Sequence, residues 1–138
     1  MPFKLEIVTP EARIFSDDVD SVVLPGVEGE MGVLPAHANL VTTLKHGELV
    51  YTKGSKSVPF AVGEGLVEVT GTTTRILTDM AVGVDDIDEK AVEAALERAR
   101  HALENLKPGA DNEEVAAAMA MIQRTTAQLH VKRKRRTL

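Results

Sequence analysis

The chain contains no cysteine among its 138 residues. Disulfide bridges, thiolate-bound metals and a cysteine nucleophile are therefore excluded. Aromatic residues are nearly as scarce, because the chain has three phenylalanines, one tyrosine and no tryptophan. A buried core must for this reason be built from aliphatic side chains, and a hydrophobic content of 43% is sufficient for one.

Long apolar runs are also missing from the sequence. No segment approaches the roughly 20 apolar residues that a membrane-spanning helix needs. The first residues do not resemble a signal peptide, because Lys4 and Glu6 interrupt them. We therefore expect a cytoplasmic chain, or one that is held at the membrane only through a partner.

Charge is distributed unevenly along the chain. The formal net charge is −5, yet residues 132–136 are five consecutive cations, so the remainder sums to −10. A nucleic-acid-binding protein usually has a more general positive surface. Three interpretations of the basic end stay open: a solvated charge run, a nucleic-acid contact, or the cationic face of a helix that docks on an acidic protein surface.

The first part of the chain predicts a sandwich or barrel of short antiparallel strands. Segments rich in Val, Leu, Ile and Thr recur about every 8–12 residues and are separated by glycine and proline, a spacing typical of all-β domains. The expected strands are 4–8, 19–24, 41–44, 48–52, 58–62, 66–70 and 74–78.

In the later part of the chain, apolar residues recur at three- and four-residue steps, which indicates amphipathic helices. Asp86 with Glu89, and Asp111 with Glu114, predict two helix starts. A turn at Pro108-Gly109 should place the two helices antiparallel. Their shared seam is largely alanine, so we expect each helix to form readily but the pairing to be weak.

Together these patterns predict an α+β chain with two domains. A β-sandwich occupies residues 1–84, and a mobile helical hairpin occupies residues 85–138.

No pattern predicts a catalytic, metal or cofactor site. The glycine-rich run 26–32 is followed by Val33-Leu34-Pro35, which does not open a helix as a nucleotide-binding loop requires. The four histidines have no ligand spacing, and the carboxylates at 85–89 are expected to stabilise a helix N-terminus. We expect no catalytic residue, no metal and no cofactor; a small β-barrel hydrolase or isomerase is the enzyme alternative.

Residues 23–40, Val-Leu-Pro-Gly-Val-Glu-Gly-Glu-Met-Gly-Val-Leu-Pro-Ala-His-Ala-Asn-Leu, closely resemble the signature stretch of the epsilon subunit of bacterial F-type ATP synthases. Similar segments lie at 5–11, 62–69, 76–79 and 87–89, so the resemblance covers nearly the whole chain. It implies a non-catalytic, peripheral subunit of the central stalk, on the cytoplasmic face of the inner (plasma) membrane. Such a subunit couples rotation between the membrane c-ring and the catalytic head.

The resemblance also implies partner contacts. Residues 28–31 would meet the polar loops of the c-ring, and His37 would lie near the gamma subunit. The basic end would approach an acidic segment of a catalytic β subunit and slow ATP hydrolysis. The residues expected to contact partners are Glu28, Gly29, Glu30, Met31, His37, Arg124, Lys132, Arg133, Lys134, Arg135 and Arg136. The alternative is a small β-sandwich interaction module whose basic tail binds nucleic acid.

One motif departs from the family pattern. Some members bind ATP between the folded helices through Ile/Leu-Asp-x-x-Arg-Ala at the start of the hairpin. Here residues 87–92 read Ile-Asp-Glu-Lys-Ala-Val, so Ala91 stands where the arginine is expected. Lys90 lies one position early, about 100° around the helix. Arg98 and Arg100 remain available to a phosphate, but we expect no tight ATP binding.

Overall fold

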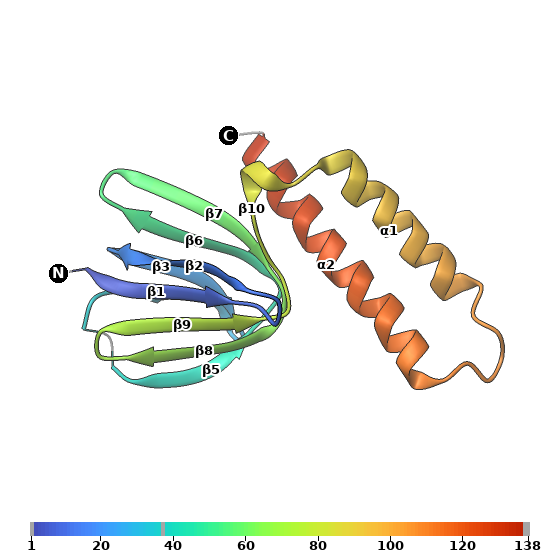
Figure 1. Cartoon of the computed structure of the whole chain (residues 1–138), viewed down its shortest axis with the longest axis horizontal. Helices are drawn as coiled ribbons and strands as arrows, with labels where there is room; N and C mark the ends of the chain where they lie inside the picture. The colour runs from blue at the N-terminus through green and yellow to red at the C-terminus, as the bar shows by residue number, and fades with distance from the viewer. Residues whose placement is uncertain (1, 37, 137–138) are drawn as a thin grey trace.

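A computed structural model of the chain describes residues 2–36 and 38–136, and shows a β-sandwich followed by two antiparallel helices (Figure 1). A short 3-10 helix, η1 (Val84–Asp86), leads from the sandwich to α1 (Glu89–Glu104) and α2 (Asn112–Arg136). The strands are β1 (Phe3–Val8), β2 (Arg13–Val19), β3 (Ser21–Gly26), β4 (Gly29–Val33), β5 (Leu40–Leu44), β6 (Gly47–Lys53), β7 (Lys56–Val62), β8 (Gly65–Thr70), β9 (Thr73–Thr78) and β10 (Ala81–Gly83). The predicted α+β fold class is confirmed.

The strands form one hydrogen-bonded sheet that folds over itself. Its order is β10-β7-β6-β3-β5-β8-β9-β1-β2, with β4 paired to β3. All paired strands are antiparallel except β1 and β9, which run parallel. At the open side β2 packs on β6 and β7 through the rings of Phe15, Tyr51 and Phe60, whose centroids lie 4.6–6.2 Å apart. Three of the four aromatic residues therefore close the sandwich.

The core between the layers is aliphatic, as the scarcity of aromatics requires. Alternate residues of β1, Phe3, Leu5 and Ile7, point into it and are buried. Glu6 is also buried and accepts a hydrogen bond from Arg75 Nε at 3.1 Å. This bond holds the pKa of Glu6 below its usual value, against the opposite effect of burial.

Three strands lie outside the predicted set. β2 is largely exposed and polar, so it has no clear apolar alternation, and β10 has only three residues. β4 begins inside the glycine-rich run 26–32 and ends at Val33, outside the predicted strands. It forms a hairpin with β3 through the two-residue turn Val27-Glu28, and Gly29 has a φ of 114° that favours glycine.

The helix starts agree with the sequence in one case and differ in the other. The Glu114 amide donates to the Asp111 carboxylate at 2.8 Å, as predicted. Asp86 does not cap α1. The cap is Asp88, whose carboxylate accepts from the Ala91 amide at 3.2 Å. The reason is that Ile87 is extended and buried, which separates η1 from α1.

The predicted alanine seam is only partly buried. Ala99 is buried, whereas Ala91, Ala94 and Ala117 are exposed, and the buried Ala127 lies toward the sandwich instead of the seam. No residue of α2 before Thr125 is buried, so its C-terminal half carries most of the packing. Within the part of the chain that the structure describes, neither helix is long and apolar enough to cross a membrane.

Candidate functional site

The seam between α2 and the sandwich brings together residues that are far apart in the sequence. In Figure 1 the C-terminal half of α2 lies beside η1 and the ends of β6 and β7, while α1 lies further from the sandwich. Val131 of α2 is fully buried there, in a cluster with Ala61, Met80, Val84 and Ile87. The hairpin is therefore docked through a small apolar contact near its C-terminal end.

Glu48 of β6 lies beside this apolar contact and binds two cations of α2. Arg135 donates two hydrogen bonds to it, from Nε to Oε2 and from a terminal nitrogen to Oε1, each 2.9 Å long. Lys134 Nζ donates to Oε1 at 3.2 Å. The Glu48 side chain is only 14% exposed and that of Arg135 is 30% exposed. Burial raises the pKa of Glu48, but its hydrogen bonds to Arg135 and Lys134 outweigh this and hold the pKa below its usual value.

The two preceding cations bind different groups. Lys132 Nζ donates to the carbonyl oxygen of Val84 at 3.0 Å, at the end of the sandwich. Arg133 turns to the other side and pairs with Glu89 of α1 at 2.8 Å and with Glu93, one turn further on. The bonds to Glu89 and then Glu93 raise the pKa of Arg133. Arg133 thus joins the two helices, whereas Arg135 joins α2 to the sandwich.

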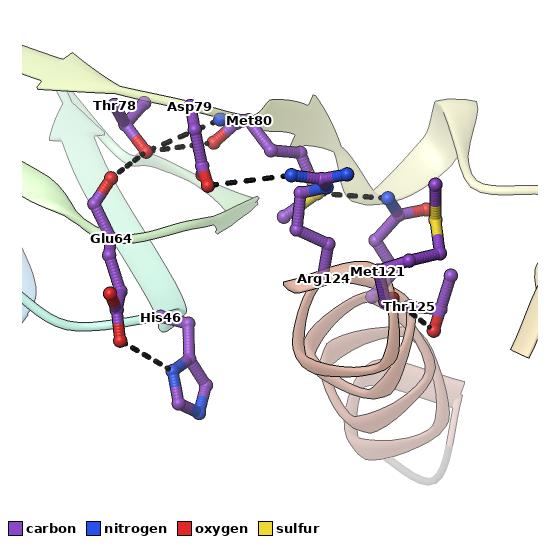
Figure 2. Close-up of polar contacts among 9 residues, drawn as sticks. His46, Glu64, Thr78, Asp79, Met80, Met121, Arg124 and Thr125 are labelled. Carbon is purple, nitrogen blue, oxygen red and sulfur yellow. Dashed lines mark hydrogen bonds and ion pairs between the residues drawn. The ribbon is translucent and has the colours of Figure 1, made fainter. Parts of the chain in front are cut away.

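A second polar contact lies two to three turns earlier on α2. Figure 2 shows Arg124 reaching Asp79, with a terminal nitrogen 3.6 Å from the carboxylate, at the corner between β9 and β10. The Thr78 hydroxyl holds this corner, since it lies 3.1 Å from the Glu64 carbonyl and 3.2 Å from that of Met80. Arg124 is thereby positioned against the sandwich.

The residues between 26 and 31 lie on the β3–β4 hairpin, and among them only Glu30 reaches the seam. Glu28 is exposed at the β3–β4 turn, and Met31 packs partly on the sandwich core. Glu30 lines a cavity of about 400 Å³ between the sandwich and α2, together with His46, Glu48 and His130. His46 also lies 3.9 Å from Glu64 (Figure 2). The site residues predicted from sequence therefore fall into two groups on the described surface, the β3–β4 hairpin and the seam.

Two of the predicted contacts fall outside what the structure describes. His37 is not among the described residues, and neither is the side chain of Arg136.

Sequence reasoning missed the acidic residues that these cations bind. They are Glu48, Asp79, Glu89 and Glu93. The charge excess of the body was visible, but no local spacing could indicate Glu48, which lies 87 positions from Arg135.

Arg98 and Arg100, the arginines left for a phosphate, face different spaces. Arg98 lines an apolar cavity of about 570 Å³ between the distal parts of the helices. Arg100 lines another of about 490 Å³ beside His130 and Arg133, and lies 3.4 Å from Glu97. The two guanidinium groups therefore do not converge on one phosphate position.

Exposed apolar side chains gather on the sandwich rather than on the seam. Val41 of β5 is 69% exposed and Leu66 of β8 is 46% exposed. The register pairs Thr43 with Leu66, so Val41 and Leu66 lie diagonally on one outer face. Leu34, which follows β4, is another exposed apolar side chain of the sandwich, at 64%. Such surface on a small domain indicates a protein contact.

The geometry can be compared with known proteins. Residues 2–84, which contain the entire sandwich, match the family model for the ATP synthase delta/epsilon chain, beta-sandwich domain. The chain is also 40% identical over 136 residues to the ATP synthase epsilon chain of Herpetosiphon aurantiacus, covering 99% of this chain and 98% of that one. This chain belongs to the ATP synthase epsilon chain family.

Other members and fold relatives agree with this assignment. ATP synthase epsilon chain 2 of Syntrophotalea carbinolica is 41% identical over 128 residues, which cover 93% of this chain and 91% of that one. A chain of the Euglena gracilis mitochondrial ATP synthase structure has the same fold, with a TM-score of 0.72 and 22% identity over 99% of this chain and 82% of its own length. The epsilon chain is a non-catalytic subunit, so the family assignment confirms the expectation that this chain is not an enzyme.

Proposed function

We propose that this epsilon chain transmits rotation in the central stalk of ATP synthase, between the c-ring and the catalytic head, and restrains ATP hydrolysis through its helices. The observation that carries the proposal is the match to an epsilon chain over both the sandwich and the helices, at 40% identity. The nucleic-acid alternative is set aside, because the chain matches an ATP synthase epsilon chain over 99% of its length, the basic end included.

The sandwich supplies the surfaces for the rotor. Its exposed apolar face around Val41 and Leu66 suits a permanent contact with the gamma subunit. The β3–β4 hairpin presents Glu28 at its exposed turn, which suits the polar loops of the c-ring. Through these contacts the chain is held peripherally at the cytoplasmic face of the inner membrane.

The helical hairpin supplies the regulation. It is docked through one small apolar cluster and a few ion pairs, so it can leave the sandwich without unfolding the sandwich core. Once undocked, its basic end can bind an acidic segment of a catalytic β subunit by charge complementarity. We propose the division of labour at Val84, with rotor contacts before it and regulation after it.

ATP is a poor candidate for the signal that holds the hairpin. The expected arginine is absent at position 91, and Arg98 and Arg100 line separate cavities. We therefore propose that the docked state is held by contacts within the chain.

One reconstitution tests these roles together. The ATP synthase complex is assembled with the full chain, with a chain ending at Val84, and with a chain in which residues 132–136 are neutral. We expect the shortened chain still to bind gamma, and both altered chains to raise the rate of ATP hydrolysis. Loss of gamma binding by the shortened chain would contradict the division at Val84. Unchanged hydrolysis with both chains would contradict the inhibitory role.

A further inference from the structure

The cations proposed to inhibit hydrolysis are engaged within the chain. Across the described side chains 132–135, every cation has a partner from the sandwich, η1 or α1. A partner protein cannot bind these groups until the bonds within the chain are broken. The docked hairpin is thus also a state in which the basic end is covered.

Glu48 is the acceptor best placed to cover it. A bidentate arginine–carboxylate pair is among the strongest geometries for a charged hydrogen bond, and Glu48 binds Lys134 as well. Its side chain is 14% exposed, so water and salt screen these bonds less than they screen a surface pair. One carboxylate therefore engages two adjacent cations of α2.

The position of Glu48 couples this ion pair to the packing of α2. Glu48 lies directly opposite Ala61 in the β6–β7 register, and Ala61 is buried in the cluster with Val131. Directly opposite residues project on the same face of a sheet. The ion pair and the apolar contact consequently lie side by side, and both must separate when α2 leaves.

Arg133 does not share this role. Its acceptors Glu89 and Glu93 belong to α1, so its bonds survive if the two helices leave the sandwich together. Of the bonds made by the described side chains 132–135, those of Lys132, Lys134 and Arg135 have to break in that movement. The Arg124–Asp79 pair, earlier on α2, has to break as well.

We propose that Glu48 is an internal substitute for the acidic partner surface: it binds Lys134 and Arg135 in the docked state and competes with the catalytic subunit for them. The inference rests on the proposed inhibitory function and names the residue that opposes it. The position of the equilibrium then depends on which acidic surface, internal or external, binds the same two cations better.

The competition predicts that removing the acceptor Glu48 and removing the cations Lys134 and Arg135 have opposite effects on the inhibition of ATP hydrolysis. Glu48→Gln weakens only the docked state, so it should free the basic end and strengthen inhibition. Neutralising Lys134 and Arg135 weakens both the docked state and the partner contact, so it should relieve inhibition. A residue that merely stabilised the fold would not separate these two signs.

The first test uses the isolated full chain with one reporter, Ala127→Cys. Ala127 is 4% exposed and faces the sandwich across the cavity that contains Glu48, and the chain has no other cysteine. The labelling rate of this thiol by a soluble reagent therefore measures the undocked fraction. We expect Glu48→Gln to raise the rate about tenfold, the effect typical of losing a charged hydrogen bond. The matched control Glu11→Gln, at an exposed turn, should leave it unchanged.

Exchanging the charges of Glu48 and Arg135 distinguishes a lost ion pair from a misfolded variant. Glu48→Arg alone should label faster still, and combining it with Arg135→Glu should bring the rate back toward that of the parent. A Glu48→Gln rate within twofold of the control, or a charge exchange that restores nothing, would overturn the role of Glu48.

The second test separates this inference from the proposed function. In the assembled complex, Glu48→Gln should lower ATP hydrolysis, whereas Glu11→Gln should not. Faster labelling with unchanged hydrolysis would uphold Glu48 as the internal acceptor and refute the inhibitory function. Unchanged labelling would refute the internal acceptor, whatever the hydrolysis rate.

Discussion

Val131 makes the apolar contact that docks α2, and its truncation gives a quantitative prediction. The side chain is fully buried, against Ala61, Met80, Val84 and Ile87, all of which lie outside α2. Val131→Ala removes two buried carbons, and each contributes about 0.8 kcal/mol to burial. The docked state should lose about 1.6 kcal/mol, and somewhat more if the space left by the side chain does not collapse. Because about 1.4 kcal/mol corresponds to a factor of ten, the undocked fraction should rise roughly fifteenfold.

The same cysteine reporter at position 127 measures this change. Val115→Ala is the matched control, because Val115 lies on the same helix, only half-buried and outside the cluster. We expect the labelling rate to rise about fifteenfold in Val131→Ala and less than threefold in the control. The denaturant midpoint of the sandwich should move little, because the cluster under α2 is separate from the main core. Equal rates in the two variants would refute the inference that this cluster docks the hairpin.

Two further predictions concern the sandwich and the pH dependence of docking. In Gly65→Ala the added Cβ would lie 1.8 Å from the Leu77 carbonyl oxygen. Urea unfolding should therefore show that the free energy of unfolding falls by about 3 kcal/mol or more. Gly71→Ala, with open space around it, is the control and should change the free energy of unfolding by less than about 1 kcal/mol. The pKa of Glu48 is lower when α2 is docked, so its contribution is complete above its ordinary value of 4.5 and is lost as the pH falls through the docked value. Thiol labelling normalised for reagent reactivity should therefore accelerate below about pH 4.5 in the parent, and this rise should be smaller in Glu48→Gln. Parallel curves would contradict the assignment. His46 and His130 line the same cavity and are present in both chains, so the difference between the curves reports Glu48.

The sequence predicted the strands whose apolar residues recur at regular intervals. It did not predict the strands that are exposed or irregularly buried, because their apolar residues show no such spacing. β8 and β9 alternate between buried and less buried residues, and β1 alternates between apolar and polar residue types, so their pattern is readable. β2 is an exposed edge strand held by pairing with β1 and by Phe15, and neither of these leaves a period in the sequence. β4 was not predicted because glycines interrupt its sequence. One of them, Gly29, has the positive φ that the turn between β3 and β4 requires.

For a similar reason the sequence predicted the cations of the candidate site but not the groups that bind them. Five adjacent cations are obvious in a sequence, whereas residues 132–135 bind three acidic residues of β6 and α1 and one backbone carbonyl of η1. Glu48 looks like an ordinary strand residue until β6 and α2 are placed together. The same holds for Asp79, which becomes a partner of Arg124 only because β9 turns into β10 beside α2.

The parallel pairing of β1 with β9 dictates an order of events during synthesis. β1 can form its antiparallel hairpin with β2 as soon as both have emerged, but its second neighbour is complete only at Thr78. The sheet therefore closes late, through a contact of long sequence separation, which is the slow kind of step in β-domain folding. Both helices follow this point in the chain, so the surface that receives α2, including β6 and β7, is already assembled when α2 leaves the ribosome.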